Sequence, residues 1–167
     1  MKNKHNHAVS YLTRGAMIAA LYVALTYLSA IFGLSSGAIQ FRLSEALTIL
    51  PILMPEAIPG LFVGCILSNI LTGCALWDII FGSVATLIGC IGTRLLKNIP
   101  RKFKWFATLP PILSNAVIVP FVLIYTYGSP DSYIFLSATV ALGEIVCAGV
   151  LGSLLYFSLS KHSLFLR

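Results

Sequence analysis

The longest uncharged stretch of the sequence runs from Gly15 to Phe41, between Arg14 and Arg42. A helix needs about 20 apolar residues to cross the hydrocarbon core of a bilayer, so this stretch can cross once. It is also longer than the apolar core of a secretory signal peptide, which has roughly 7–15 residues. The sequence therefore predicts a membrane-spanning first helix, not a cleaved leader.

The rest of the chain has the same character. Of its 167 residues, 58% are apolar and 10% are charged, whereas a soluble domain has about 45–50% and about 25%. This composition leaves no polar exterior for water, and 167 residues accommodate about six crossings. We predict an all-α, polytopic protein with six transmembrane helices in a single integral membrane domain, residues 1–167. The approximate helices are 11–32, 43–54, 59–71, 77–97, 109–127 and 133–159.

The basic residues indicate which side the loops face. All except Arg42 belong to three groups, at the amino terminus, in one central loop and at the carboxyl terminus. The groups are Lys2, Lys4 and Arg14; Arg94, Lys97, Arg101, Lys102 and Lys104; and Lys161 and Arg167. The positive-inside bias then places both termini and the central loop in the cytoplasm. The net charge of +6 is thereby explained without nucleic acid. Two or four spans would also put the groups on one side, but the lengths of the apolar stretches favour six.

The second and third helices are interrupted. The segment from Leu43 to Met54 is too short to span, and Pro51, Pro55 and Pro59 break the chain around it. Short or proline-interrupted segments in a transporter are the best indication of its binding site in the sequence.

Three of the predicted spans reach full length only by including an acid: Glu45, Asp78 or Glu144. A carboxylate inside a membrane is costly unless it meets a partner. Asp78, next to Trp77, could lie at headgroup level, and Arg42 could pair with Glu45 or Glu144. One cation cannot serve three acids, so the surplus predicts a cavity open to the outside for a ligand that is positively charged or rich in hydrogen-bond donors. The candidate lining residues are Gln40, Arg42, Glu45, Asn69, Asp78, Asn115 and Glu144.

Catalytic and metal-binding motifs are absent from the sequence. No predicted span contains histidine, and there is no Gly-x-Ser-x-Gly, His-Glu-x-x-His or phosphate-binding loop. The four cysteines have no Cys-x-x-Cys spacing. We therefore expect no enzyme activity, no catalytic residue, no metal and no cofactor bound by this chain. Without a nucleotide-binding domain, any pumping must depend on another subunit or an ion gradient.

Small residues recur in the first helix. Ala16, Ala20 and Ala24 follow one another at intervals of four, so they form one face that another helix can approach closely. That helix could belong to this chain or to a partner.

Several motifs together resemble a known family. The first helix contains Arg-Gly-Ala-x-x-Ala-Ala-Leu-Tyr from Arg14 to Tyr22, as in the substrate-binding S components of energy-coupling factor (ECF) transporters. The QueT family of S components, assigned to queuosine precursors, is similar over almost the whole chain. The similar segments are Gln40–Leu47, Ala57–Cys65, Asp78–Thr86, Leu109–Asn115 and Leu142–Glu144.

The resemblance implies a function. The chain would capture a 7-deazaguanine, such as the aminomethyl or cyano form or queuine, in the plasma membrane of a prokaryote. A membrane coupling subunit and two cytoplasmic ATPases would be its partners, and the ATPases would use ATP. Ala16, Ala20 and Ala24 would contact the coupling subunit.

The resemblance also suggests roles for the site residues. Glu45 and Glu144 would bind the guanine-like edge and the cationic tail, in an order that the sequence leaves open, with Asp78 in reserve. Arg42 would fix the geometry, and Asn69 or Asn115 would meet the ring carbonyl. Two alternatives remain: a self-sufficient proton- or cation-coupled carrier using Glu45, Asp78 and Glu144, and a structural subunit of a membrane complex.

Overall fold

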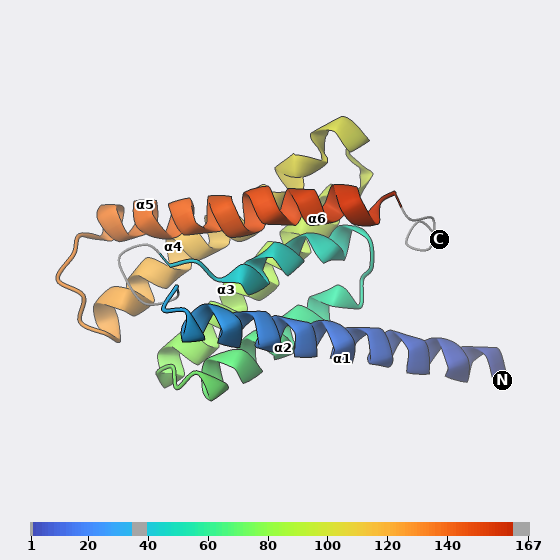
Figure 1. Ribbon diagram of the computed structural model, residues 1–167, viewed down its shortest axis with the longest axis horizontal. Coiled ribbons are helices and arrows are strands. Elements are labelled where there is room, and N and C mark those ends of the chain that lie inside the picture. The colour runs from blue at the N-terminus through green and yellow to red at the C-terminus, as the bar shows by residue number, and fades with distance from the viewer. Residues whose placement is uncertain (1, 35–39, 162–167) are drawn as a thin grey trace.

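The structure, a computed structural model, describes residues 2–34 and 40–161. Helices joined by short turns make up this part of the chain (Figure 1). No strand occurs within these ranges, so the all-α prediction is confirmed. The elements are α1 (Lys2–Ile31), the 3₁₀ helix η1 (Leu43–Ile52), α2 (Ala57–Leu71), α3 (Leu76–Leu95), the 3₁₀ helices η2 (Leu96–Asn98) and η3 (Arg101–Thr108), α4 (Leu109–Tyr125), α5 (Tyr133–Glu144), the π-helix η4 (Ile145–Leu151) and α6 (Gly152–Leu159).

Four helical stretches are long and apolar enough to cross a membrane: His7–Ile31, Leu76–Asn98, Arg101–Tyr125 and Tyr133–Leu159. The last of these joins α5, η4 and α6 into one long helix, drawn in orange to red in Figure 1. The remaining two, η1 and α2, are apolar but shorter. The short second and third helices therefore agree with the positions of the prolines in the sequence.

The first helix begins earlier than predicted. α1 starts at Lys2, whereas the apolar pattern suggested a start near Tyr11. An apolar pattern detects only the part of a helix inside the hydrocarbon, and Lys, His and Asn are compatible with helix outside it. The other helix ends differ from the predicted ones by no more than about two residues, apart from the division of the last helix into three segments.

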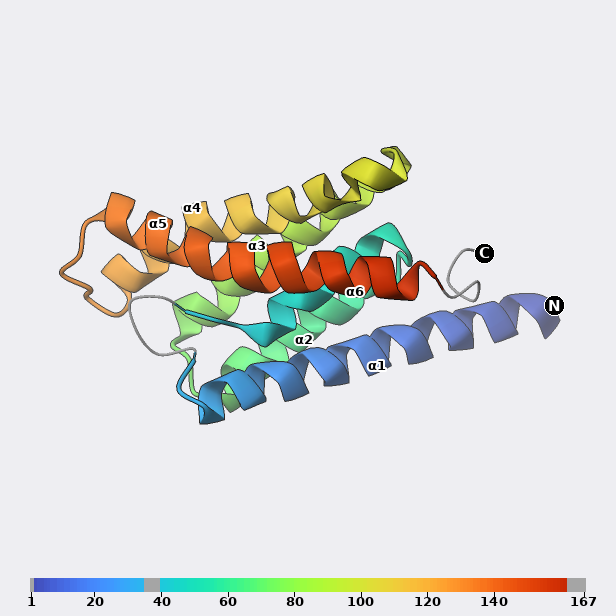
Figure 2. The ribbon, with the colours of Figure 1, turned by 45° about the horizontal axis from the view of Figure 1, so that its top comes forward.

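The short helix η1 is the central element of the fold. Eight of its ten residues are buried, and it packs against α1, α3, α6 and η4. Figure 2 shows η1, in cyan, enclosed between α1 and the α5–α6 helix. A 3₁₀ run of this length is uncommon. Arg94 supports its end, because the guanidinium Nη1 donates to the carbonyl oxygens of Pro51 at 2.9 Å and Ile52 at 3.2 Å.

Glycines allow α1 and α2 to pack closely. A β-carbon on Gly60 would lie 2.6 Å from the carbonyl oxygen of Gly15, and one on Gly64 would lie 2.9 Å from Cβ of Tyr22. Gly15 and Ala19 are buried at this contact, whereas Ala16, Ala20 and Ala24 are exposed on α1. The packing within the chain thus uses a different face of α1 from the alanine face.

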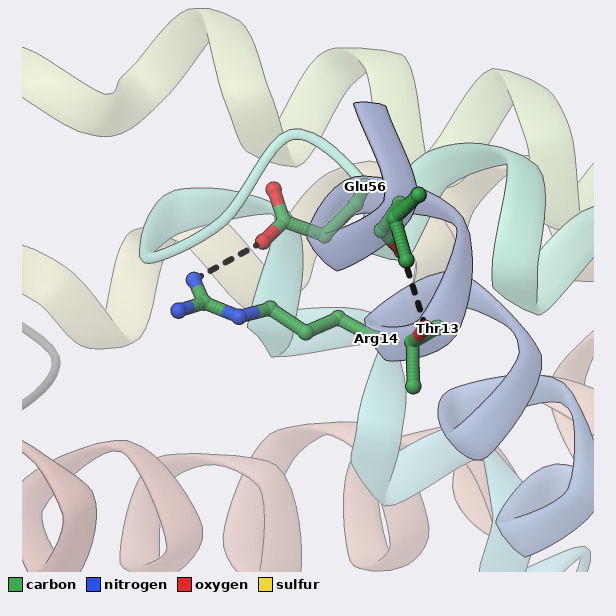
Figure 3. Close-up of polar contacts among 4 residues, drawn as sticks. Thr13, Arg14 and Glu56 are labelled. Atoms are coloured by element: carbon green, nitrogen blue, oxygen red, sulfur yellow. Dashed lines mark hydrogen bonds and ion pairs between the residues drawn. The ribbon is translucent and has the colours of Figure 1, made fainter. Parts of the chain in front are cut away.

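An ion pair joins the first half of α1 to the turn before α2. Nη1 of Arg14 lies 3.3 Å from Oε1 of Glu56 (Figure 3). Glu56 is buried, while the Arg14 side chain is 63% exposed. The start of α1, the η2–η3 connection and the end of α6 lie at one end of the bundle (Figures 1 and 2). The three basic groups lie on or next to these elements, apart from Arg167, which is outside the described residues.

Candidate functional site

Five of the seven residues predicted for the binding site come together in the structure. They line one small polar cavity of about 20 Å³, about the size of one water molecule. Its lining comprises Gln40, Arg42, Glu45, Asn115, Val119, Val140 and Glu144. The cavity lies between the segment leading into η1, α4 and α5, so residues from distant parts of the sequence build it.

Glu45 projects from the first turn of η1 and is 2% exposed. The hydroxyl of Tyr22 on α1 donates a hydrogen bond to its Oε1. Tyr22 was not predicted as a site residue. Tyr22, Thr26 and Ser29 are nevertheless spaced by four and three residues in an otherwise apolar span, and all three are buried. Such a polar stripe on one helix face is a signal that could have identified Tyr22.

Glu144 reaches the cavity from the last residue of α5, where the helix changes to the π-helix η4. Short π segments often occur at functional sites. Nδ2 of Asn115 on α4 donates to Oε1 of Glu144 at 3.0 Å, and the same amide faces Glu45. Gly143 lies directly against the carbonyl oxygen of Gln40, so only glycine allows this approach of the chain to α5.

Each of the two acids therefore has one oxygen held by the protein and one that is free. Oε2 of Glu45 and Oε2 of Glu144 are buried and have no hydrogen-bond partner in the described part of the chain. An unpartnered buried carboxylate oxygen is costly, so these two atoms are the acceptors that a ligand would satisfy.

Arg42 lines the same cavity but does not contact an acid directly. Within residues 2–34 and 40–161, no carboxylate lies within 4.0 Å of its guanidinium. It acts electrostatically on Asp78, Glu45 and Glu144 over longer distances. The direct ion pair considered for Arg42 with Glu45 or Glu144 is thus not formed, and one cation is shared among three acids.

Asp78 and Asn69 lie apart from the cavity. A β-carbon on Gly82 would be 3.3 Å from Oδ1 of Asp78 and 3.3 Å from Nδ2 of Asn69, so the two side chains flank the same turn of α3. Asp78 is 5% exposed and is therefore buried rather than at an open interface. Its Oδ2 accepts a hydrogen bond from the Tyr127 hydroxyl at 3.0 Å.

Tyr127 joins this second polar group to the start of α3. Its hydroxyl also accepts from the backbone N–H of Ala75, the residue that precedes α3, at 3.1 Å. Burial raises the pKa of Tyr127 to about 12. The phenol therefore remains a donor to Asp78 over the whole physiological pH range. The buried polar atoms of Asp78 and Asn69 thus have partners, whereas one oxygen of Glu45 and one of Glu144 at the cavity have none in the described residues.

Larger hollows exist, but their chemistry is different. One of about 560 Å³ lies along α3 and α4 and is lined almost wholly by apolar side chains, including Trp77, Phe81, Phe121 and Tyr125. It offers almost no donors or acceptors to orient a polar ligand. Among the described residues, no group of three or more His, Cys, Asp and Glu side chains could hold a metal ion.

The fold and the cavity define a class: a multi-pass membrane protein with buried carboxylates in a polar cavity between its helices. The family model described as "QueT transporter" matches residues 12–161, and the chain belongs to that family. It is also 29% identical, over 137 residues, to a protein named queuosine precursor transporter QueT from Lactococcus lactis subsp. cremoris (strain MG1363). That match covers 77% of this chain and 80% of the relative. No solved structure matches the chain significantly.

Proposed function

We propose that this chain is the substrate-binding S component of an ECF-type importer and captures a queuosine precursor, a 7-deazaguanine. The observation that supports the proposal most is the pair of buried acids, Glu45 and Glu144, each with one free oxygen at the same cavity in a chain of the QueT family.

The acids match the chemistry of such a ligand. A guanine-like edge presents two neighbouring donors, N1–H and the exocyclic amine, and an aminomethyl tail adds a cation. A carboxylate is an acceptor only, so it suits both the edge and the tail. With Oε1 of each acid held by Tyr22 or Asn115, one carboxylate would take the ring edge and the other the tail. Arg42 and Gln40 would complete the wall of the site.

Ligand binding would require the cavity to enlarge. Pockets for small molecules have volumes of about 300–1,000 Å³, far above the 20 Å³ of the closed cavity. Its wall is formed on one side by the chain at Gln40 and Arg42, which leads into η1, and on the other by α4 and α5. Separation of these two sides would open the site without unfolding a membrane-spanning helix.

The energy for uptake would come from partners. A membrane coupling subunit would pack on the exposed alanine face of α1, Ala16, Ala20 and Ala24, and two cytoplasmic ATPases would hydrolyse ATP. The chain itself would have no catalytic activity and would bind no cofactor. It would lie in the plasma membrane of a prokaryote, with the basic end of the bundle and both termini in the cytoplasm.

Two measurements test this proposal. Isothermal titration of the purified chain in detergent with the aminomethyl and cyano forms of 7-deazaguanine should show saturable binding of at least one form, and guanine should compete poorly. In proteoliposomes, uptake should require the coupling subunit, the ATPases and ATP. The ATP must be on the side of the membrane where the ATPases lie. Absence of binding by both of these forms and by queuine would reject the proposal.

A self-sufficient carrier driven by protons or cations is the second candidate. Its support is the free oxygen of each acid and the absence of a direct ion pair with Arg42 in the described residues. Glu45, Glu144 and Asp78 would then bind the coupling ion. Uptake by proteoliposomes that contain this chain alone, abolished by collapse of the ion gradient, would favour this candidate over the ECF importer.

A further inference from the structure

The buried face of α1 is joined by hydrogen bonds to three consecutive residues at the start of η1, Leu43, Ser44 and Glu45. Tyr22 donates to Glu45, Oγ1 of Thr26 donates to Oγ of Ser44 at 2.7 Å, and the backbone N–H of Leu43 donates to Oγ of Ser29 at 3.0 Å. The three residues of α1, Tyr22, Thr26 and Ser29, are at most 5% exposed. Water is therefore excluded, and α1 fixes the first turn of η1 through these bonds.

The first turn of η1 would otherwise have little support. Its own capping residue gives no support, because Arg42 occupies the capping position in an extended conformation and makes no side-chain cap bond. At the other end, Arg94 holds the carbonyl groups of Pro51 and Ile52. The short helix is thus held at both ends by side chains of neighbouring helices, and its first turn, which presents Glu45 to the cavity, depends on α1.

Among the three bonds, only that of Tyr22 reaches a residue of the cavity. Ser44 and the Leu43 backbone do not line it, whereas Glu45 does. A carboxylate on a flexible side chain has several rotamers, and a donor fixed on one oxygen leaves the other oxygen in a defined place. Oε2 of Glu45 is that other oxygen, buried and without a partner in the described residues.

We propose that Tyr22 is a positioning residue for ligand binding: it holds Oε1 of Glu45 so that Oε2 is presented to the ligand. This inference rests on the proposed function, because it assumes that Glu45 meets a deazaguanine. Asn115 does the same for Glu144. The two acids are therefore oriented by donors from two different helices, Tyr22 on α1 and Asn115 on α4. The same helix that exposes the alanine face thus directly supports a binding residue.

The test uses the full chain in detergent, titrated with the aminomethyl form of 7-deazaguanine, in a cycle of Tyr22→Phe, Glu45→Ala and the double variant. Tyr22→Phe keeps the ring and removes only the hydroxyl, so binding should weaken about tenfold, the worth of one hydrogen bond to a charged group. In the Glu45→Ala background the same change should alter affinity by less than about twofold, because its target is gone.

Thr26→Val is the matched control. It removes a buried hydrogen bond from the same face of α1 to the neighbouring residue Ser44, so it should lower the thermal midpoint about as much as Tyr22→Phe while changing affinity by less than about twofold. If only a small fraction of Tyr22→Phe is folded, the shift of its thermal midpoint with increasing concentration of the cyano form gives the same comparison. This measurement does not require that every molecule be folded and bound at the start.

The outcomes separate the two proposals. Equal losses of affinity in Tyr22→Phe and Thr26→Val, or a Tyr22→Phe loss that persists in the Glu45→Ala background, would overturn the positioning role and leave the proposed function intact. Failure of the wild-type chain to bind the aminomethyl form, the cyano form and queuine would reject the proposed function, and the role of Tyr22 with it.

Discussion

Nδ2 of Asn115 on α4 lies 3.0 Å from Oε1 of Glu144 at the end of α5. Both side chains are buried, at 5% and 8% exposure. The amide of Asn115 donates a hydrogen bond to Oε1 of Glu144, and the other oxygen, Oε2, has no partner in the described residues. The contact thus both makes the buried acid tolerable and determines which of its oxygens faces the cavity.

Asn115→Leu should weaken ligand binding more than a similar change at Asn69. The substitution removes the donor and leaves Glu144 uncompensated, at a cost of about 1–3 kcal/mol, which corresponds to a loss of affinity of roughly five- to 150-fold. Titration calorimetry of the two variants with the aminomethyl ligand measures the difference.

Asn69→Leu is the informative comparison, since Asn69 is also buried but lies outside the cavity. It should reduce stability, because its amide contacts Cys65, and leave affinity within about threefold of wild type. Equal effects of the two substitutions on affinity would show that Asn115 is not part of the ligand site.

Gly60→Ala should destabilise the fold. The added methyl group would stand 2.6 Å from the Gly15 carbonyl oxygen, which belongs to backbone and cannot move away without shifting α1. Overpacking of this kind costs about 1–3 kcal/mol. The thermal midpoint in detergent, followed by circular dichroism, should fall by several degrees.

Gly149→Ala provides a control for that measurement. A β-carbon there would meet Cδ1 of Ile112 at 3.7 Å, an ordinary contact, so the midpoint should change much less. A midpoint of Gly60→Ala equal to that of Gly149→Ala would mean that α1 and α2 are not packed as closely as described.

Ala20→Trp should impair assembly with the coupling subunit and leave ligand binding by the isolated chain unchanged. Ala20 is exposed, so the isolated chain should accommodate the larger side chain, which would obstruct a partner helix. Co-purification with the coupling subunit, together with titration of the chain alone, checks both parts. Loss of ligand binding in the isolated variant would mean that the alanine face packs within this chain.

Some features could be predicted from the sequence because they follow from the cost of charge in a membrane. Glu45 and Glu144 interrupt apolar stretches that are otherwise long enough to span, so a shared polar site was a natural expectation, and both acids line the cavity. The prolines likewise indicated the short second helix, which became η1.

Other features depend on contacts that no sequence pattern displays. In a helix that is apolar all round, periodicity cannot show that Asn69 and Asp78 lie outside the lining of the cavity. The 3₁₀ geometry of η1 and the π geometry of η4 could not be predicted either, because an apolar stretch does not distinguish these helix types from an α-helix. Tyr22 was missed because a single tyrosine in an apolar span also fits an ordinary packing role.

The measurement that tests the central claim most directly is titration of Glu144→Gln and Glu45→Gln with the aminomethyl form of 7-deazaguanine. Glu56→Gln is the control, because Glu56 is equally buried but pairs with Arg14 outside the cavity. A charge-assisted hydrogen bond contributes about 1.5–3 kcal/mol. Both site variants should therefore bind at least about tenfold more weakly, and Glu56→Gln should stay within about twofold of wild type. Affinity of Glu144→Gln within about twofold of wild type would contradict the account.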